Sequence, residues 1–270
     1  MKLVEFKPLE HTDGKVVGYL HDKIAEMSGH RKKYPTVVLC PGGAYCFVSQ
    51  RESDSAALEY LAAGYQVFIL HYSVGAAAKG FISLMELSAT VMKIRDNEEN
   101  WNCDGEKIAV CGFSAGGHLA ASLGVLWNHP ELTKRFDTKS GRNRPAGVVL
   151  GYPVITAGEF AHEESIATVS GSEKGTPEYE FFSLENRVTA ECAPMFIWHT
   201  GEDECVPVEN TIAMISALRK NKIPFECHIF PDGDHGMSVC TEEVGADDPY
   251  NRQWVQLSKN WLSKLFNYHL

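Results

Sequence analysis

The chain has 270 residues, of which 44% are hydrophobic and 22% charged, and its formal net charge is -10 at pH 7. This composition is that of a globular protein, and the length is sufficient for a large buried core, so we expect a single α/β domain over residues 1–270. The negative charge argues against nucleic acid or an anionic membrane surface as a partner. It places no restriction on a neutral small molecule.

Targeting and metal-binding motifs are missing from the sequence. The N-terminal stretch MKLVEFKPLEHTDGK has charges every few positions and no long apolar run, so we expect no secretory signal, no membrane span and a cytoplasmic location. The scattered cysteines are then expected to be reduced and mostly buried. Because CxxC, HExxH and phosphate-binding glycine loops do not occur, we expect no metal and no cofactor. The basic run from Arg31 to Lys33 predicts a solvated loop.

Strand and helix patterns alternate along most of the chain, which is typical of a mostly parallel sheet. Residues 1–20 predict two antiparallel strands at a sheet edge, joined by a turn at Asp13-Gly14. The later elements are, in chain order, a strand at 36–40, a helix at 53–63, a strand at 66–71, an amphipathic helix within 81–101, a strand at 108–111 leading into a helix, a loop at 130–144, a strand at 147–152, a strandless excursion at 154–191, a strand at 195–199, a helix at 208–221, a strand at 225–230 and a closing helix at 254–266.

Two of these segments carry more specific expectations. The excursion at 154–191 is expected to pass over the top of the sheet and to form part of a binding-site wall. On the closing helix, the apolar spacing predicts that Trp254, Leu257, Trp261 and Leu265 face inward.

The sequence Gly112-Phe113-Ser114-Ala115-Gly116 lies directly between a strand and a helix. This pattern is typical of a sharp strand-to-helix turn that raises a nucleophilic serine above the sheet edge. Side chains at Gly112 and Gly116 would collide with neighbouring elements in so tight a turn. Ser114 is therefore the predicted nucleophile.

A serine hydroxyl needs a base to take its proton, and the base needs a carboxylate to orient it. After this kind of turn the acid comes next in the chain and the histidine last. The loop after the 225–230 strand contains His235, the predicted base. The loop after the 195–199 strand contains Glu202, Asp203 and Glu204. We choose Asp203, because its shorter side chain lies in the middle of the loop.

The other histidines have simpler interpretations. For His118, one turn into the helix after Ser114, we favour packing or hydrogen bonding. His199 and His228 lie within strands, where hydrogen-bonded core or surface positions are the default. His162 lies in the excursion, where contact with substrate is the less favoured alternative.

The loop after the 36–40 strand reads Pro41-Gly42-Gly43-Ala44-Tyr45. A tetrahedral oxyanion needs backbone N–H donors. We expect one from Ala115 and a second from Gly43 or Ala44, and the choice between these two stays open. Gly42, Tyr45 and Phe47 are predicted to line the substrate pocket.

These motifs in this order resemble the esterase and lipase branch of the α/β-hydrolases, and more narrowly small acetylesterases related to acetyl xylan esterases and other carbohydrate esterases. The segments that carry the resemblance read LCPGGAYCFVSQRE, YQVFILHYSV, VCGFSAGGHLAASL, FIWHTGEDECVPVEN and FPDGDHGM. The resemblance implies a central sheet of about eight mostly parallel strands, with helices on both faces. It also implies a serine esterase that cleaves short-chain esters, acetyl esters above all, including those of carbohydrates. An acyl-enzyme on Ser114 would form without a cofactor.

Two other functions remain open. An exopeptidase or another amide hydrolase of this fold would use the same three residues, and a non-catalytic binding protein would use none of them. The expected partner is a small-molecule ester, and the sequence leaves open whether the protein forms a homo-oligomer.

Overall fold

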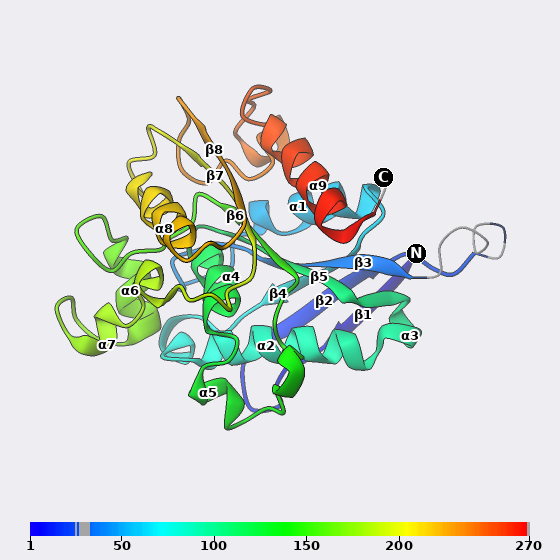
Figure 1. Cartoon of the computed structure of the whole chain (residues 1–270). Helices are drawn as coiled ribbons and strands as arrows, with labels where there is room; N and C mark the ends of the chain where they lie inside the picture. Colours follow the sequence, from blue (N-terminus) through cyan, green and yellow to red (C-terminus); the bar gives the residue numbers. More distant parts are fainter. Residues whose placement is uncertain (25, 27–32, 269–270) are drawn as a thin grey trace.

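The computed structural model, which describes residues 1–24, 26 and 33–268, contains an eight-stranded sheet with strand order β1-β2-β4-β3-β5-β6-β7-β8 (Figure 1). The strands are β1 (Lys2–Phe6), β2 (Lys15–Leu20), β3 (Tyr34–Cys40), β4 (Gln66–His71), β5 (Cys103–Phe113), β6 (Gly147–Gly151), β7 (Met195–Thr200) and β8 (Phe225–Phe230). Strands β1 and β2 are antiparallel, and β2 is antiparallel to β4. The other neighbouring pairs are parallel. The predicted edge hairpin and mostly parallel sheet are confirmed.

Helices cover both faces of this sheet, as expected. They are α1 (Asp54–Ala62), α2 (Ile82–Asp96), α3 (Glu98–Trp101), α4 (Ser114–Leu126), α5 (Pro130–Thr133), α6 (Glu163–Ser170), α7 (Pro177–Glu180), α8 (Glu209–Lys220) and α9 (Gln253–Phe266). Helices α1 and α9 pack on one face, whereas α2, α4 and α8 pack on the other (Figure 1).

Strand β3 explains why two helical layers are needed. All seven of its residues are buried. Val38 and Cys40 belong to the core under α2, α4 and α8, whereas Val37 and Leu39 belong to the core under α1 and α9. Since successive side chains of a strand point to opposite faces, a continuous apolar run requires cover on both sides.

The closing helix corrects one prediction. In α9 the buried residues are Trp254, Val255, Ser258, Leu262 and Phe266. Trp254 is buried as predicted, and Leu257 and Trp261 are partly buried and pack against the core on this face, but Leu265 is exposed. The helix also turns the polar Ser258 inward, where its hydroxyl is 3.0 Å from that of Tyr60.

Several other expectations can be compared directly with the structure. Residues 154–191 contain no strand and carry α6, α7 and a 3-10 turn. The predicted loop at 130–144 contains the short helix α5. All eight cysteines are free, and most are buried, with Cys46 and Cys205 exposed. Arg31 and Lys32 lie outside the described residues, whereas Lys33 pairs with Glu98 and Glu99, both in α3. Across the described residues, no helix is both long and apolar enough to cross a membrane.

Candidate active site

Ser114 begins α4 directly after β5 and has a φ of 53°, in the left-handed region. The two flanking glycines allow this turn. A Cβ at Gly112 would lie 2.1 Å from the carbonyl oxygen of Gly116, and a Cβ at Gly116 would lie 2.0 Å from that of Cys40. No other residue fits either position without backbone movement. The predicted steric reason for both glycines is confirmed.

The three residues predicted as a triad lie in hydrogen-bond contact. His235 Nε2 is 2.8 Å from Ser114 Oγ, and His235 Nδ1 is 2.7 Å from Asp203 Oδ2. They come from the carboxyl ends of β5, β7 and β8, which meet at one edge of the sheet. With Nδ1–H donating to the carboxylate, Nε2 is the bare nitrogen that can accept the serine proton.

Asp203 is held as an ionised acceptor. Its Oδ1 accepts the backbone N–H groups of Cys205 and Val206 at 3.0 and 2.8 Å. Burial by itself would raise the pKa of Asp203, but hydrogen bonds from His199 and His235 outweigh it and hold that pKa well below its ordinary value. The competing acids Glu202 and Glu204 are exposed.

His199 is a buried neighbour of the acid whose contact with it the sequence did not indicate. Its Nε2 lies 2.8 Å from the carbonyl oxygen of Val206 and 3.4 Å from Asp203 Oδ2, and its Nδ1 lies 2.8 Å from Thr211 Oγ1. Because a carbonyl oxygen can only accept, the proton of the neutral His199 ring is on Nε2. This N–H also faces the carboxylate of Asp203.

Backbone N–H groups around Ser114 are candidates for the oxyanion site. Ala115 is in the first turn of α4, where N–H groups have no partner within the helix. Gly43 and Ala44 have φ values of 121° and 54° and line the cavity with Ser114. The N–H of Gly42 instead donates to Glu52 Oε2 at 2.7 Å. Gly42 is not among the residues that line the cavity, which corrects its predicted place in the pocket lining.

The cavity at Ser114 has a volume of about 520 Å³. It is lined by Gly43, Ala44, Phe47, Val48, Ser49, Gln50, Arg51, Glu52, Ser114, His162, Glu164, Cys205, His235 and Gly236. Phe47 lines it, as predicted. His162 and Glu164 belong to the 154–191 excursion, which thus contributes to the wall.

Tyr45 is not part of this lining, and its predicted role is wrong. It is buried, and its hydroxyl lies 2.9 Å from His118 Nδ1. Left-handed backbone at Ala44 and Tyr45 turns the ring into the core, where it packs edge-on against Tyr72. His118 Nε2 is 2.9 Å from the carbonyl oxygen of Phe182, so both ring nitrogens are used in packing contacts, as expected.

His162 offers a defined donor on the cavity wall. Its Nδ1 accepts the backbone N–H of Ser165 at 3.3 Å at the start of α6. Because that N–H can only donate, the proton of the neutral ring is on Nε2. Burial, together with the nearby His235, lowers the pKa of His162 and favours this neutral form.

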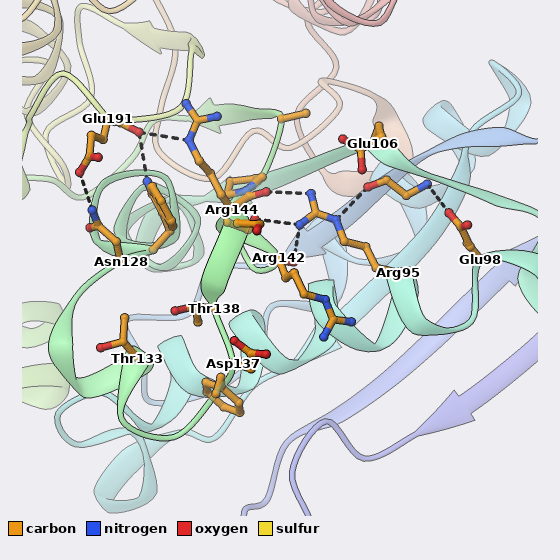
Figure 2. Close-up of a pocket in the computed structure, with 17 residues that line it drawn as sticks. Arg95, Glu98, Glu106, Asn128, Thr133, Asp137, Thr138, Arg142, Arg144 and Glu191 are labelled. Atoms are coloured by element: carbon orange, nitrogen blue, oxygen red, sulfur yellow. Dashed lines mark hydrogen bonds between the residues drawn. The ribbon is translucent and has the colours of Figure 1, made fainter.

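A larger hollow, of about 1430 Å³, lies at the amino-terminal ends of β5 and β6, away from Ser114 (Figure 2). Two of the arginines that line it already donate to backbone carbonyl groups. Arg95 donates to the carbonyl oxygens of Gly105, Gly141 and Arg144 at 2.8, 3.0 and 3.0 Å. Arg144 in turn donates to the carbonyl oxygen of Glu191 at 3.1 Å. We therefore assign the hollow a structural role.

Metal ligands are not grouped anywhere in the part of the chain that the structure describes: no three or more His, Cys, Asp or Glu side chains are placed to hold an ion.

Comparisons with known proteins give the family. Residues 23–218 match the BD-FAE family model, and residues 183–269 match the dienelactone hydrolase family model. The chain is 37% identical over 234 residues to endo-1,4-beta-xylanase B of Butyrivibrio fibrisolvens, covering 84% of this chain and 36% of that protein. It is 27% identical over 235 residues to an acetylxylan esterase of Xylanibacter ruminicola, covering 85% of this chain and 45% of that protein. It thus spans less than half the length of these two curated relatives.

A solved structure matches over nearly the whole chain. The acetyl ester-xyloside bifunctional hydrolase of Caldicellulosiruptor lactoaceticus superposes with a TM-score of 0.82 at 33% identity, covering 97% of this chain and 92% of that chain. The fold is that of the α/β-hydrolases, and the chain belongs to the BD-FAE family.

Proposed function

We propose that the protein is a serine hydrolase that cleaves short-chain carboxylic esters, acetyl esters above all, through Ser114, His235 and Asp203. The observation that carries the proposal is the unbroken chain of hydrogen bonds from Ser114 Oγ through His235 to Asp203 Oδ2. Ser114 and His235 also line the cavity, so substrate can reach them. A serine hydroxyl in this arrangement is a nucleophile with its base already in place.

In the first half-reaction, Ser114 Oγ attacks the acyl carbon while His235 Nε2 takes the serine proton. Asp203 stabilises the imidazolium that forms. The oxyanion is bound by the N–H of Ala115 and by that of Gly43 or Ala44, and the loss of one such donor typically costs about 3 to 4 kcal/mol of transition-state stabilisation. The alcohol then leaves with the proton from His235.

In the second half-reaction, a water molecule takes the position of the alcohol. His235 accepts a proton from this water as it attacks the acyl carbon, and returns that proton to Ser114 Oγ when the acyl–oxygen bond breaks and the acid is released. The same residues thus serve both halves, and the reaction needs only the side chains and backbone groups named above.

Preference for acetyl groups is supported by two observations. Phe47 lies on the rim of a cavity of about 520 Å³ that must hold both halves of the ester. Two relatives have acetyl esters in their names: the Xylanibacter acetylxylan esterase and the Caldicellulosiruptor hydrolase. Acetylated carbohydrates are accordingly the first substrates to test. We further propose that residues 1–270 form a single domain and that the protein is cytoplasmic.

The test is a substrate panel with wild-type protein and Ser114→Ala. The panel contains p-nitrophenyl esters of increasing acyl length, acetylated xylo-oligosaccharides and peptide p-nitroanilides. We expect the highest kcat/KM for acetyl esters and almost none in Ser114→Ala, with circular dichroism unchanged. A preference for the anilides would replace the esterase assignment with an amidase, and full activity of Ser114→Ala would overturn the nucleophile.

A further inference from the structure

Glu52 is a buried carboxylate next to the site to which the proposed chemistry gives no role. It ends a 3-10 turn at Gln50–Glu52 and is only 3% exposed, although its side chain reaches the cavity lining. Among the described residues it forms no ion pair. A buried carboxylate without a cationic partner depends on hydrogen bonds for its stability, so its contacts indicate what it does.

Both carboxylate oxygens of Glu52 accept short hydrogen bonds. Oε2 accepts the N–H of Gly42 at 2.7 Å, and Oε1 accepts the hydroxyl of Tyr152 at 2.7 Å. The Tyr152 hydroxyl in turn accepts the N–H of Ser238 at 2.8 Å. Glu52 therefore joins the loops that follow β3, β6 and β8.

The first of these loops contains the candidate oxyanion donors. Gly42 directly precedes Gly43 and Ala44, both of which have positive φ. A Cβ on Gly42 would lie 2.9 Å from Ser114 Cβ and 2.7 Å from Glu52 Oε2, so the peptide is held against the nucleophile. The hydrogen bond from the Gly42 N–H to Glu52 therefore holds the start of the turn that carries the N–H groups of Gly43 and Ala44.

The other two loops contain or contact the base. The ring of Tyr152 meets that of His235 edge-on, with centroids 4.9 Å apart and an interplanar angle of 69°. Ser238 lies three residues after His235 in the same loop. Tyr152 and Ser238 have φ values of 35° and 49°. Such backbone is strained and persists only where surrounding contacts hold it.

We propose that Glu52 is a positioning residue that sets the oxyanion loop and the histidine loop relative to Ser114 through its bonds to Gly42 and Tyr152. This inference rests on the proposed function, because it assigns Glu52 to the same site. Glu52 acts through these neighbours and does not itself take part in proton transfer, since both of its oxygens already accept hydrogen bonds from the protein.

The main test is Glu52→Gln compared with Glu86→Gln. The amide keeps the shape of Glu52 but has one acceptor oxygen, so if that oxygen keeps the Gly42 N–H, the amide NH2 faces the Tyr152 hydroxyl, which loses the acceptor of its own proton. Glu86 is a matched control, because it is also buried and accepts from the N–H groups of Gly14 and Ser73, away from the cavity. Both variants lose hydrogen bonds to a buried carboxylate, but only one of them is expected to alter the site.

We expect Glu52→Gln to lower kcat for p-nitrophenyl acetate by about 10- to 100-fold, the range caused by misplacing catalytic groups by ~1 Å, while KM changes by less than about threefold. Glu86→Gln should keep the wild-type kcat when assayed below its unfolding temperature. Equal kcat in the two variants would overturn the inference.

Two further measurements keep the test decisive. The first is the rate at which a fluorophosphonate labels Ser114. This reaction depends on the oxyanion site and on His235 but not on an ester substrate, so it can be measured even if p-nitrophenyl acetate is a poor substrate. Labelling should be slower in Glu52→Gln and unchanged in Glu86→Gln. Should Glu52→Gln not fold, Tyr152→Phe removes only the link to the histidine loop and should slow labelling by about 10-fold. If Glu52→Gln and Tyr152→Phe are both labelled as fast as the wild-type protein, the positioning role is contradicted. If the wild-type protein is labelled normally but has no esterase activity, only the proposed substrate is refuted.

Discussion

Replacing Asp203 by asparagine tests the orientation of the base. The oxygen of the new amide is expected to stay with the backbone N–H groups of Cys205 and Val206, because both can only donate. The amide nitrogen then faces His235 Nδ1, which must become an acceptor. The proton of the neutral ring moves to Nε2, and the nitrogen 2.8 Å from Ser114 Oγ can no longer accept.

This change of tautomer should lower kcat/KM by about 10⁴-fold, equivalent to about 5 kcal/mol of transition-state stabilisation. The assay is hydrolysis of p-nitrophenyl acetate, with unfolding temperatures measured in parallel. Glu202→Gln and Glu204→Gln are the matched controls, because both side chains are exposed in the same loop. The reasoning is refuted if Asp203→Asn keeps more than about a tenth of the activity, or if Glu202→Gln is the damaging change.

Three further predictions concern single residues. Gly116→Ala should destabilise the protein by about 1 to 3 kcal/mol or more in urea unfolding, because its Cβ would lie 2.0 Å from the carbonyl oxygen of Cys40, whereas Gly158→Ala, whose Cβ would meet only the Thr156 hydroxyl at 3.2 Å, should cost less. Burial lowers the pKa of His118 from 6.5 to about 4. As the pH falls, the unfolded state therefore binds a proton at this histidine before the folded state does, and about 3 kcal/mol of folding stability should be lost between pH 6.5 and about 4. In His118→Gln the pH dependence of unfolding should shrink by that amount; an unchanged dependence would contradict the assignment. His162→Phe removes the Nε2–H donor from the cavity wall, which could bind a sugar hydroxyl but has no such partner in p-nitrophenol. The substitution should therefore raise KM for acetylated xylo-oligosaccharides several-fold more than for p-nitrophenyl acetate, and equal changes for both would contradict this role.

The sequence identifies Ser114, Asp203 and His235 as a set because each depends on local features. Ser114 lies in a glycine-flanked turn between a strand and a helix, and the acid and the base each follow a buried strand. Since the carboxyl ends of parallel strands lie at one edge of the sheet, the three residues can be expected to lie close together even when the strand order is not known.

What the sequence does not reveal depends on contacts between distant segments. Tyr45 looks like a pocket residue by its position, but the hydrogen bond to His118, 73 residues away, places it in the core. Ser258 breaks the apolar pattern of α9, and only its contact with Tyr60 explains why it faces inward. Glu52 looks like an ordinary surface acid until Gly42 and Tyr152 are seen to converge on it.

The most direct test of the account is detection of the acyl-enzyme. Wild-type protein is mixed rapidly with excess p-nitrophenyl acetate, quenched in acid and digested, and the peptides are analysed by mass spectrometry. The account predicts a burst of p-nitrophenol and an acetyl group on the peptide at Ser114, absent in Ser114→Ala. Acetylation at any other residue during turnover, or turnover that persists in Ser114→Ala, would contradict it.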